Sequence, residues 1–180
     1  KQAQEAVTEA ANRCGQPYVN ARWLGGMLTN FTTIRSRVQR MEELEAMQSD
    51  GRMALLPKKE QAILGKELAK LQTNLNGIRN MTRVPDAIFI IDTNREALAI
   101  NEAKRLRIPV IGTLDTNCDP DEVAYGIPCN DDAIRSVRLM ADFIADAVLA
   151  GGVAPVTAAE MAPEAAEEAA AEAVEAPAAE

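Results

Sequence analysis

Two apolar segments of this chain repeat one pattern. Residues 85–94 (PDAIFIIDTN) and 108–117 (IPVIGTLDTN) each combine an early proline with a short apolar run, and both end in Asp-Thr-Asn. Apolar runs this continuous are typical of strands that are buried on both faces, as in parallel sheets. A proline is tolerated at the start of such a strand, where no ladder N–H is required. The sequence therefore predicts two buried parallel strands.

The segment between these strands is expected to be a helix. Residues 95–107 place apolar side chains at helical spacing, namely Leu98, Ile100, Ala103 and Leu106. Parallel neighbours require a crossover connection, which is usually an α-helix. The predicted fold class is therefore α/β, with a parallel sheet flanked by helices.

A helical hairpin is predicted over residues 32–77. Two apolar stripes, the second with a repeat of about 3.5 residues, are separated by a break that contains Gly51 and Pro57. The stripes consist of Ile34, Val38, Met41 and Leu44, and of Leu64, Leu68, Leu71, Leu75 and Ile78. Both are narrow and flanked by charged residues. We therefore expect an antiparallel coiled-coil hairpin that projects from the α/β domain.

The amino-terminal part is expected to contain a helix, a strand and a loop. Residues 1–14 place small apolar side chains on one helical face, and Gly15 follows where a left-handed cap residue would sit. Residues 17–19 predict a short strand. Residues 20–31 predict a loop in which Gly25 and Gly26 permit backbone angles that bulkier residues avoid.

The carboxyl-terminal part of the α/β domain is expected to end in a helix. Residues 119–122 (DPDE) predict the start of a short helix that runs to Tyr125, and residues 127–129 predict an edge strand. Residues 130–132 (NDD) are N-cap types for a final helix that ends at Gly151. Its apolar face, which we expect against the sheet, consists of Ile134, Val137, Ala141, Ile144 and Val148.

Charge divides the chain into unlike parts. The net charge is −8, but residues 151–180 carry seven Glu and no Lys or Arg, and too few bulky apolar residues to fold, so we expect a disordered acidic tail. Residues 1–83 carry 13 basic and 8 acidic residues, whereas residues 84–150 carry 6 and 12. The predicted organisation is an α/β domain of residues 1–31 and 78–150, an inserted hairpin of residues 32–77, and the tail.

A stretch of arginines without nearby carboxylates predicts a polyanionic partner. Between residues 10 and 41 the chain has five Arg and no Asp or Glu, a plausible footprint for RNA phosphates. The predicted RNA-binding residues are Arg22, Arg35, Arg37, Arg40, Lys58, Lys59, Arg79 and Arg83. For the arginines of residues 35–40, a solvated helix face is the alternative. Trp23 could stack on a base beside Arg22, or it could be buried as an anchor of the loop.

The sequence predicts no catalytic residue, metal or cofactor. Asp92 and Asp115 follow the two strands, where α/β sheets bind ligands, but the repeated Asp-Thr-Asn favours side-chain caps over a metal or phosphate-acceptor site. The chain has no histidine and no glycine-rich phosphate motif. Cys14, Cys118 and Cys129 lack metal-ligand spacing and are expected to be buried free thiols. No run of about 18 apolar residues predicts a membrane span, and a cytoplasmic location is expected.

Five segments, in order, closely resemble the bacterial small-subunit ribosomal protein S2 family. They are residues 22–31 (RWLGGMLTNF), the hairpin, residues 85–94, residues 102–120 (EAKRLRIPVIGTLDTNCDP) and residues 125–136 (YGIPCNDDAIRS), within a resemblance that spans about residues 1–152. It implies a flavodoxin-like or Rossmann-like sheet with an inserted coiled-coil hairpin. It also implies a non-enzymatic constituent of the ribosome that supports translation, binds 16S ribosomal RNA and neighbouring ribosomal proteins, and helps recruit protein S1. Members of that family begin well before the position of Lys1, so we expect an amino-terminally truncated fragment.

Two other function classes remain open from the residues alone. A nucleotide- or phosphate-binding α/β enzyme would need a glycine-rich loop after its first strand, which could lie only upstream of Lys1. A protein-only adaptor would use the hairpin to bind its partner without any RNA. Neither a membrane nor a small-molecule substrate is expected for the ribosomal alternative.

Overall fold

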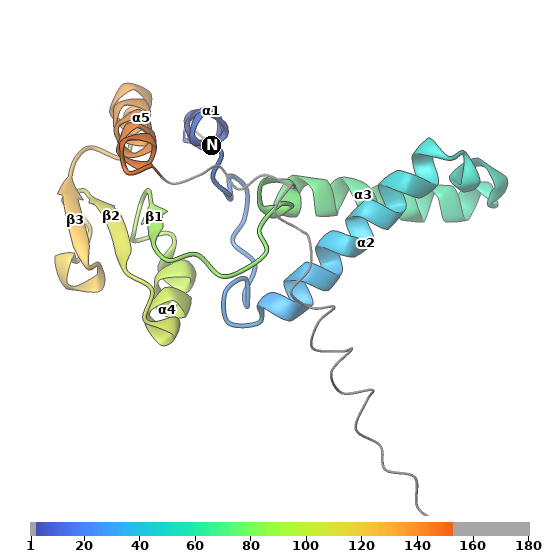
Figure 1. The fold of residues 1–180 in the computed structure, drawn as a ribbon, viewed down its shortest axis with the longest axis horizontal. Coiled ribbons are helices and arrows are strands. Elements are labelled where there is room, and N and C mark those ends of the chain that lie inside the picture. The colour runs from blue at the N-terminus through green and yellow to red at the C-terminus, as the bar shows by residue number, and fades with distance from the viewer. Residues whose placement is uncertain (1–2, 153–180) are drawn as a thin grey trace, which may run out of the picture.

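The computed structural model describes residues 3–152 and shows an α/β body with a long helical arm (Figure 1). The predicted acidic tail lies outside the described residues. The helices are α1 (Gln4–Cys14), α2 (Phe31–Ser49), α3 (Lys58–Leu75), α4 (Ala97–Leu106) and α5 (Ile134–Ala150). The strands are β1 (Ile88–Ile90), β2 (Val110–Leu114) and β3 (Tyr125–Pro128), and three short 3-10 helices are η1 (Arg52–Leu55), η2 (Asn76–Ile78) and η3 (Pro120–Glu122).

The three strands form one parallel sheet in the order β1-β2-β3. Ile88 pairs with Val110, and Thr113 pairs with Ile127. The Ile88 N–H donates to the carbonyl of Pro109 over 3.1 Å. The proline thus takes part in the sheet through its carbonyl, since it has no backbone N–H to donate. Helix α4 connects β1 to β2 as the crossover. The predicted βαβ unit and the α/β fold class are confirmed.

The core between α4 and the sheet uses only part of the predicted helical stripe. Ile100 and Ala103 are buried against Ile90, Val110 and other apolar residues. By contrast, the side chains of Leu98 and Leu106 are 58% and 41% exposed. The predicted helix is thus present, and the sheet covers only the face of α4 that carries Ile100 and Ala103.

Helices α2 and α3 run antiparallel and form the arm (Figure 1). Met41, Leu44 and Leu75 are fully buried in the core that the two helices share, and Leu64 and Leu71 are partly buried. The predicted stripes therefore face each other. The left-handed supercoil of a coiled coil, and the division of the chain into domains, stay predictions.

The predicted strand at residues 17–19 is wrong, because these residues belong to no strand in the described part of the chain. The Tyr18 N–H instead donates to the carbonyl of Gly77 over 3.0 Å, which ties the segment after α1 to the end of the arm. A Cβ at Gly77 would lie 2.2 Å from the Tyr18 carbonyl oxygen. Only glycine allows the two backbone segments to approach this closely.

The predicted short helix before β3 is also corrected. Asp119 caps it as expected, because its carboxylate accepts the Asp121 N–H over 2.9 Å, but the helix is a single 3-10 turn. The backbone becomes extended at Val123, and the strand occupies Tyr125–Pro128 rather than residues 127–129. Pairing of Tyr125 with Ile111 draws this residue into the sheet.

Helix α5 packs mainly on α1 and not, as predicted, on the sheet. Ala141 and Ala145 of α5 are buried with Ala10 and Cys14 of α1. These small side chains allow a close helix–helix contact. The Asn130 carboxamide oxygen accepts the backbone N–H of Asp132 and Ala133 in the turn before α5, but the N-cap residue is Ala133 and no side chain caps the helix, so the predicted cap at residues 130–132 is wrong. Ile134, which was expected on the apolar face, is 57% exposed.

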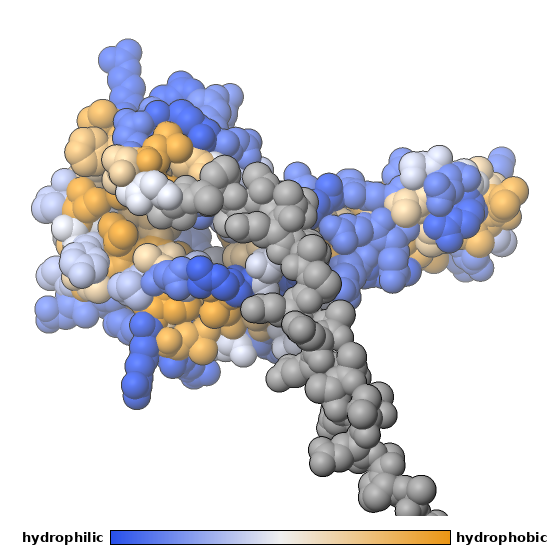
Figure 2. All heavy atoms as spheres, viewed as in Figure 1, coloured by the Kyte–Doolittle hydropathy of each residue, from blue (hydrophilic) through white to orange (hydrophobic). Residues whose placement is uncertain are grey.

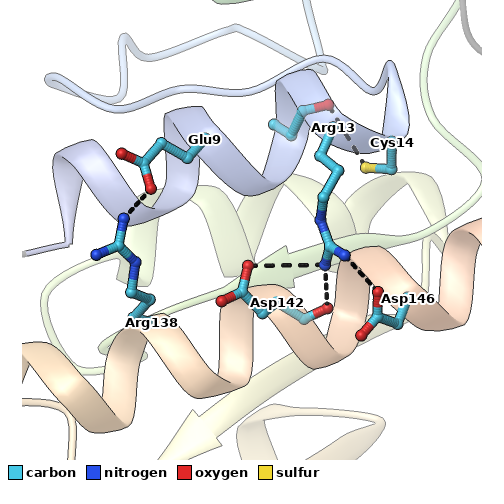
Figure 3. Close-up of polar contacts among 7 residues, drawn as sticks. Glu9, Arg13, Cys14, Arg138, Asp142 and Asp146 are labelled. Carbon is cyan, nitrogen blue, oxygen red and sulfur yellow. Dashed lines mark hydrogen bonds and ion pairs between the residues drawn. The ribbon is translucent and has the colours of Figure 1, made fainter.

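Ion pairs border this helix–helix contact (Figure 3). Glu9 of α1 pairs with Arg138 of α5, and Arg13 donates to the Asp146 carboxylate over 2.5 Å and to the Asp142 carbonyl over 2.7 Å. Arg13 therefore does not belong to a free basic footprint, although it lies in the arginine-rich stretch. All three cysteines are free, and Cys14 is buried, whereas Cys118 and Cys129 are partly exposed and so depart from the prediction.

We expect Gly77→Ala to destabilise the chain by about 2 kcal/mol, because its Cβ must displace the Tyr18 backbone. Gly65, in the interior of α3, has no neighbouring atom within 4 Å of its ideal Cβ and is the matched control. Gly65→Ala should raise stability by about 0.5–1 kcal/mol through helix propensity. Urea unfolding of both variants measures the difference, and equal effects of the two substitutions would show that the contact at Tyr18 is dispensable.

Candidate nucleic-acid interface

A single carboxylate, that of Glu102 on α4, anchors the loop that precedes the arm. It accepts the backbone N–H groups of Gly26, Leu28 and Thr29 over 2.7, 2.9 and 3.1 Å. The Trp23 indole N–H and the Thr29 hydroxyl donate to the same carboxylate over 3.2 and 3.1 Å. Glu102 is only 8% exposed. Five donors therefore hold residues 23–29 in one conformation against α4.

The environment of Glu102 keeps it ionised at neutral pH. Burial raises the pKa of this carboxyl, but the hydrogen bonds from Thr29, Leu28, Gly26 and Trp23 outweigh burial, so the pKa lies below its ordinary value. Trp23 is half-buried and directed to Glu102, which supports its interpretation as an anchor of the loop. Arg22, directly before it, is exposed.

Two of the predicted RNA-binding arginines on α2 have partners within the protein. The Arg35 guanidinium donates to the Met81 carbonyl over 2.9 Å and is half-buried. Arg40 lies between Glu43, at 3.2 Å, and Glu67 of α3, at 3.4 Å. Both arginines thus contribute to the structure of the arm.

The two predicted arginines that follow the arm are also paired. Arg79 donates to Glu45 of α2 over 2.5 Å. Arg83 forms two hydrogen bonds with Asp86, both of 2.9 Å. The positive charge of these guanidinium groups is offset locally by a carboxylate, so an RNA phosphate would have to compete for them.

Four predicted cations remain without a side-chain hydrogen bond or ion pair to any residue between 3 and 152. They are exposed, and comprise Arg22 in the anchored loop, Arg37 on α2, and Lys58 and Lys59 at the start of α3. Figure 2 shows hydrophilic side chains over most of the arm that carries three of them. The structure thus separates the eight predicted residues into four paired or anchored ones and four free ones.

The aspartates at the carboxyl ends of β1 and β2 are engaged in turns. Asp92 accepts the backbone N–H of Arg95 over 3.1 Å. Asp115 accepts that of Thr116 over 2.7 Å and that of Asp131 over 3.2 Å, and these bonds lower the pKa of Asp115. Across residues 3–152, no group of three or more Cys, Asp or Glu side chains is arranged to hold a metal ion. Both aspartates thus stabilise turns, but neither caps the following helix, because the N-cap residue of α4 is Glu96 and no side chain caps it.

Comparison with known proteins places this architecture among ribosomal proteins. The family model described as "Ribosomal protein S2" matches residues 1–151. The chain belongs to the ribosomal protein S2 family. The predicted resemblance to this family is confirmed. Because the family consists of structural proteins, the prediction of a non-enzymatic role is also confirmed at the level of the family, and the enzyme alternative is set aside. No helix in the described part of the chain is long and apolar enough to cross a membrane.

Individual relatives carry the name small ribosomal subunit protein uS2. That of Micrococcus luteus is 59% identical over 155 residues, which are 86% of this chain and 54% of the relative. That of Arthrobacter sp. is 58% identical over 86% of this chain and 53% of its own length. That of Koribacter versatilis is 54% identical over 84% and 50%, respectively. The chain spans about half the length of the curated relatives it matches.

The role of Glu102 was not predicted from the sequence. It lies 73–79 residues from its donors in the loop, so no local pattern predicts the contact. Its place on the buried face of α4, among Ala99, Ile100 and Ala103, was the available signal. Buried carboxylates require partners, and the glycine loop supplies backbone N–H groups.

We expect Glu102→Gln to cost about 3 kcal/mol of unfolding free energy, because the amide removes the charge and replaces one acceptor oxygen with a donor facing backbone N–H groups. Glu42→Gln, at an exposed position of α2, is the control and should change stability little.

The destabilisation should depend on pH in a defined direction. Because the folded-state pKa of Glu102 is depressed, its contribution is fully present above the ordinary glutamate pKa and is lost as the pH falls through the folded value. Urea unfolding from neutral to acidic pH should therefore show the gap between wild type and Glu102→Gln closing at low pH. A gap that is small at neutral pH, or widens in acid, contradicts this role of the carboxylate.

Proposed function

We propose that this chain is a structural constituent of the small subunit of the cytoplasmic ribosome, where it binds 16S ribosomal RNA and supports translation. The observation that carries the proposal is the set of exposed cations, Arg22, Arg37, Lys58 and Lys59, that have no partner among the described residues. They lie in the basic part of the chain, residues 1–83, in a protein of a ribosomal family.

Free cations suit phosphate contacts better than paired ones. When a Lys or Arg without a partner in the protein contacts an RNA phosphate, no hydrogen bond or ion pair within the protein is broken. The contact also releases counterions from the RNA. The paired residues Arg40, Arg79 and Arg83 would first lose a carboxylate partner. We therefore assign the main phosphate contacts to the four free cations and a secondary role to Arg35, Arg40, Arg79 and Arg83.

The structure also offers surfaces for protein neighbours. Leu55, at the tip of the arm, is 86% exposed, and Leu139 and Phe143 of α5 are 60% and 68% exposed. Exposed apolar side chains of this size are typical of contacts with other proteins. We propose neighbouring small-subunit proteins as their partners, and recruitment of protein S1 as a task of the complete protein. No membrane, cofactor or small-molecule partner is part of the proposal.

We predict that replacing the four free cations by Ala weakens binding to 16S ribosomal RNA and makes it less salt-dependent. Each phosphate contact contributes about 0.7–0.9 to the slope of log affinity against log salt, so the slope should become less steep by about 3. The matched control replaces the paired arginines Arg40, Arg79 and Arg83, which should change the slope by less. Filter binding or fluorescence anisotropy across a salt series measures both variants.

Sedimentation separates the RNA-binding proposal from the protein-only adaptor. The wild-type chain should co-sediment with small subunits depleted of their own copy of this protein, and should be released by high salt. An unchanged salt slope in the variant without the four free cations, together with binding to its partner that survives nuclease treatment, would favour the adaptor.

A further inference from the structure

The acidic half of the chain, residues 84–150, has its charges sorted along the sheet. Asp92, Asp115 and Asp131 lie at the carboxyl ends of the strands. The opposite end of the sheet receives the end of α4, with Lys104, Arg105 and the cap residue Arg107 (Figure 1). The net charge of −6 thus conceals a basic edge opposite an acidic one.

The three cations of this basic edge are free. Lys104, Arg105 and Arg107 are all exposed, and their side chains form no hydrogen bond or ion pair with any residue of the described range 3–152. Cations in the last turn of a helix interact favourably with the helix dipole, which accounts for Lys104 and Arg105. It does not account for Arg107, which follows the last helical residue.

Arg107 occupies a backbone conformation that suits glycine. Its φ is 58°, and among the described residues the only other non-glycine with a positive φ is Asp92, at 61°. Asp is one of the residue types that tolerate this region, and the Asp92 carboxylate forms a local bond to the Arg95 N–H. Arg107 has no such compensation, although a glycine cap would avoid the strain. The strained position therefore carries a guanidinium that the fold itself does not use.

The basic edge adjoins elements that carry residues of the proposed RNA surface. Glu102, on the same helix two residues before Lys104, binds the loop that begins at Arg22. The Pro109 carbonyl, two residues after Arg107, accepts the N–H of Ile88, which brings the segment leading from Arg83 into β1 to the same end of the sheet. The loop with Arg22 and the segment before β1 are thus both joined to the part of the chain that carries the basic edge.

We propose that Lys104, Arg105 and Arg107 form a second phosphate-binding surface, which contacts the backbone of the same ribosomal RNA and turns the amino-terminal edge of the sheet toward it. The proposal rests on the proposed function. The RNA backbone is the partner because the edge presents free cations on the helix that anchors the loop with Arg22. The acidic carboxyl-terminal edge of the sheet faces away from the RNA, since phosphate would repel it.

The test compares two single-charge deletions in the full chain. Arg107→Gly removes the guanidinium and relieves the strained backbone, so the midpoint of urea unfolding should rise or stay constant. Binding to protein-free 16S ribosomal RNA should nevertheless weaken several-fold, with a slope against log salt that is less steep by about 0.7–0.9. Arg135→Ala is the control, because Arg135 is exposed and without a side-chain partner in the described chain but lies near the acidic edge, at the start of α5. It should leave RNA affinity unchanged.

A triple variant, Lys104→Ala with Arg105→Ala and Arg107→Gly, should lower the slope by about 2–3. If it binds RNA like the wild type while the variant without the four free cations of the loop and arm does not, the second surface is refuted and the proposed function stands. If neither variant affects RNA binding, both proposals fail. Equal losses of RNA affinity in Arg107→Gly and Arg135→Ala would show that only the net charge of the protein matters, and would refute the second surface. Unchanged affinity for RNA with weaker reassociation to small subunits would identify an acidic protein partner instead of RNA.

Discussion

The buried carboxylate of Glu102 determines where the basic half of this chain lies relative to its α/β half. Its five donors all come from residues 23–29, directly before α2. A glutamate that is 8% exposed is stable only when such donors replace its hydration, and the loop has few other partners for its backbone N–H groups. The loop before the arm and helix α4 are therefore held together by one ionised group.

This anchoring explains how a flexible loop can hold the cation Arg22 in a defined position. A glycine-containing loop would by itself sample many conformations, and each would place Arg22 differently. Because the residues after Arg22 are fixed to α4, the entropy of ordering the loop is lost on folding, and it would not be lost again on binding of the proposed RNA partner. A second contact, between Tyr18 and Gly77, joins the segment before the loop to the base of the arm, directly after α3. The arm is thereby connected to the body through both of its ends.

The sequence predicted those parts of the fold whose signals are local. Apolar continuity identified β1 and β2, and the apolar stripes identified both helices of the arm. The partner of α5 was not predictable, because Ala141 and Ala145 are too small to indicate whether a sheet or a helix covers them. The eight candidate cations were chosen by charge alone, and the pairing of Arg79 with Glu45 spans 34 residues, so only the folded structure separates paired from free cations. The eight candidates did not include Lys104, Arg105 and Arg107, because the half of the chain that contains these residues is acidic overall.

Sorting of charge by strand direction gives the α/β body an orientation that its composition conceals. In a parallel sheet all strands end at one edge, where aspartates cap the turns that follow, so the acidic groups gather there for structural reasons. The crossover helix runs back and ends at the other edge, where its dipole favours cations. The topology alone thus separates the two signs of charge. Of the two edges, only the one where α4 ends presents the free cations Lys104, Arg105 and Arg107, so the RNA partner that we propose would meet the amino-terminal edge of the sheet and be repelled by the opposite one.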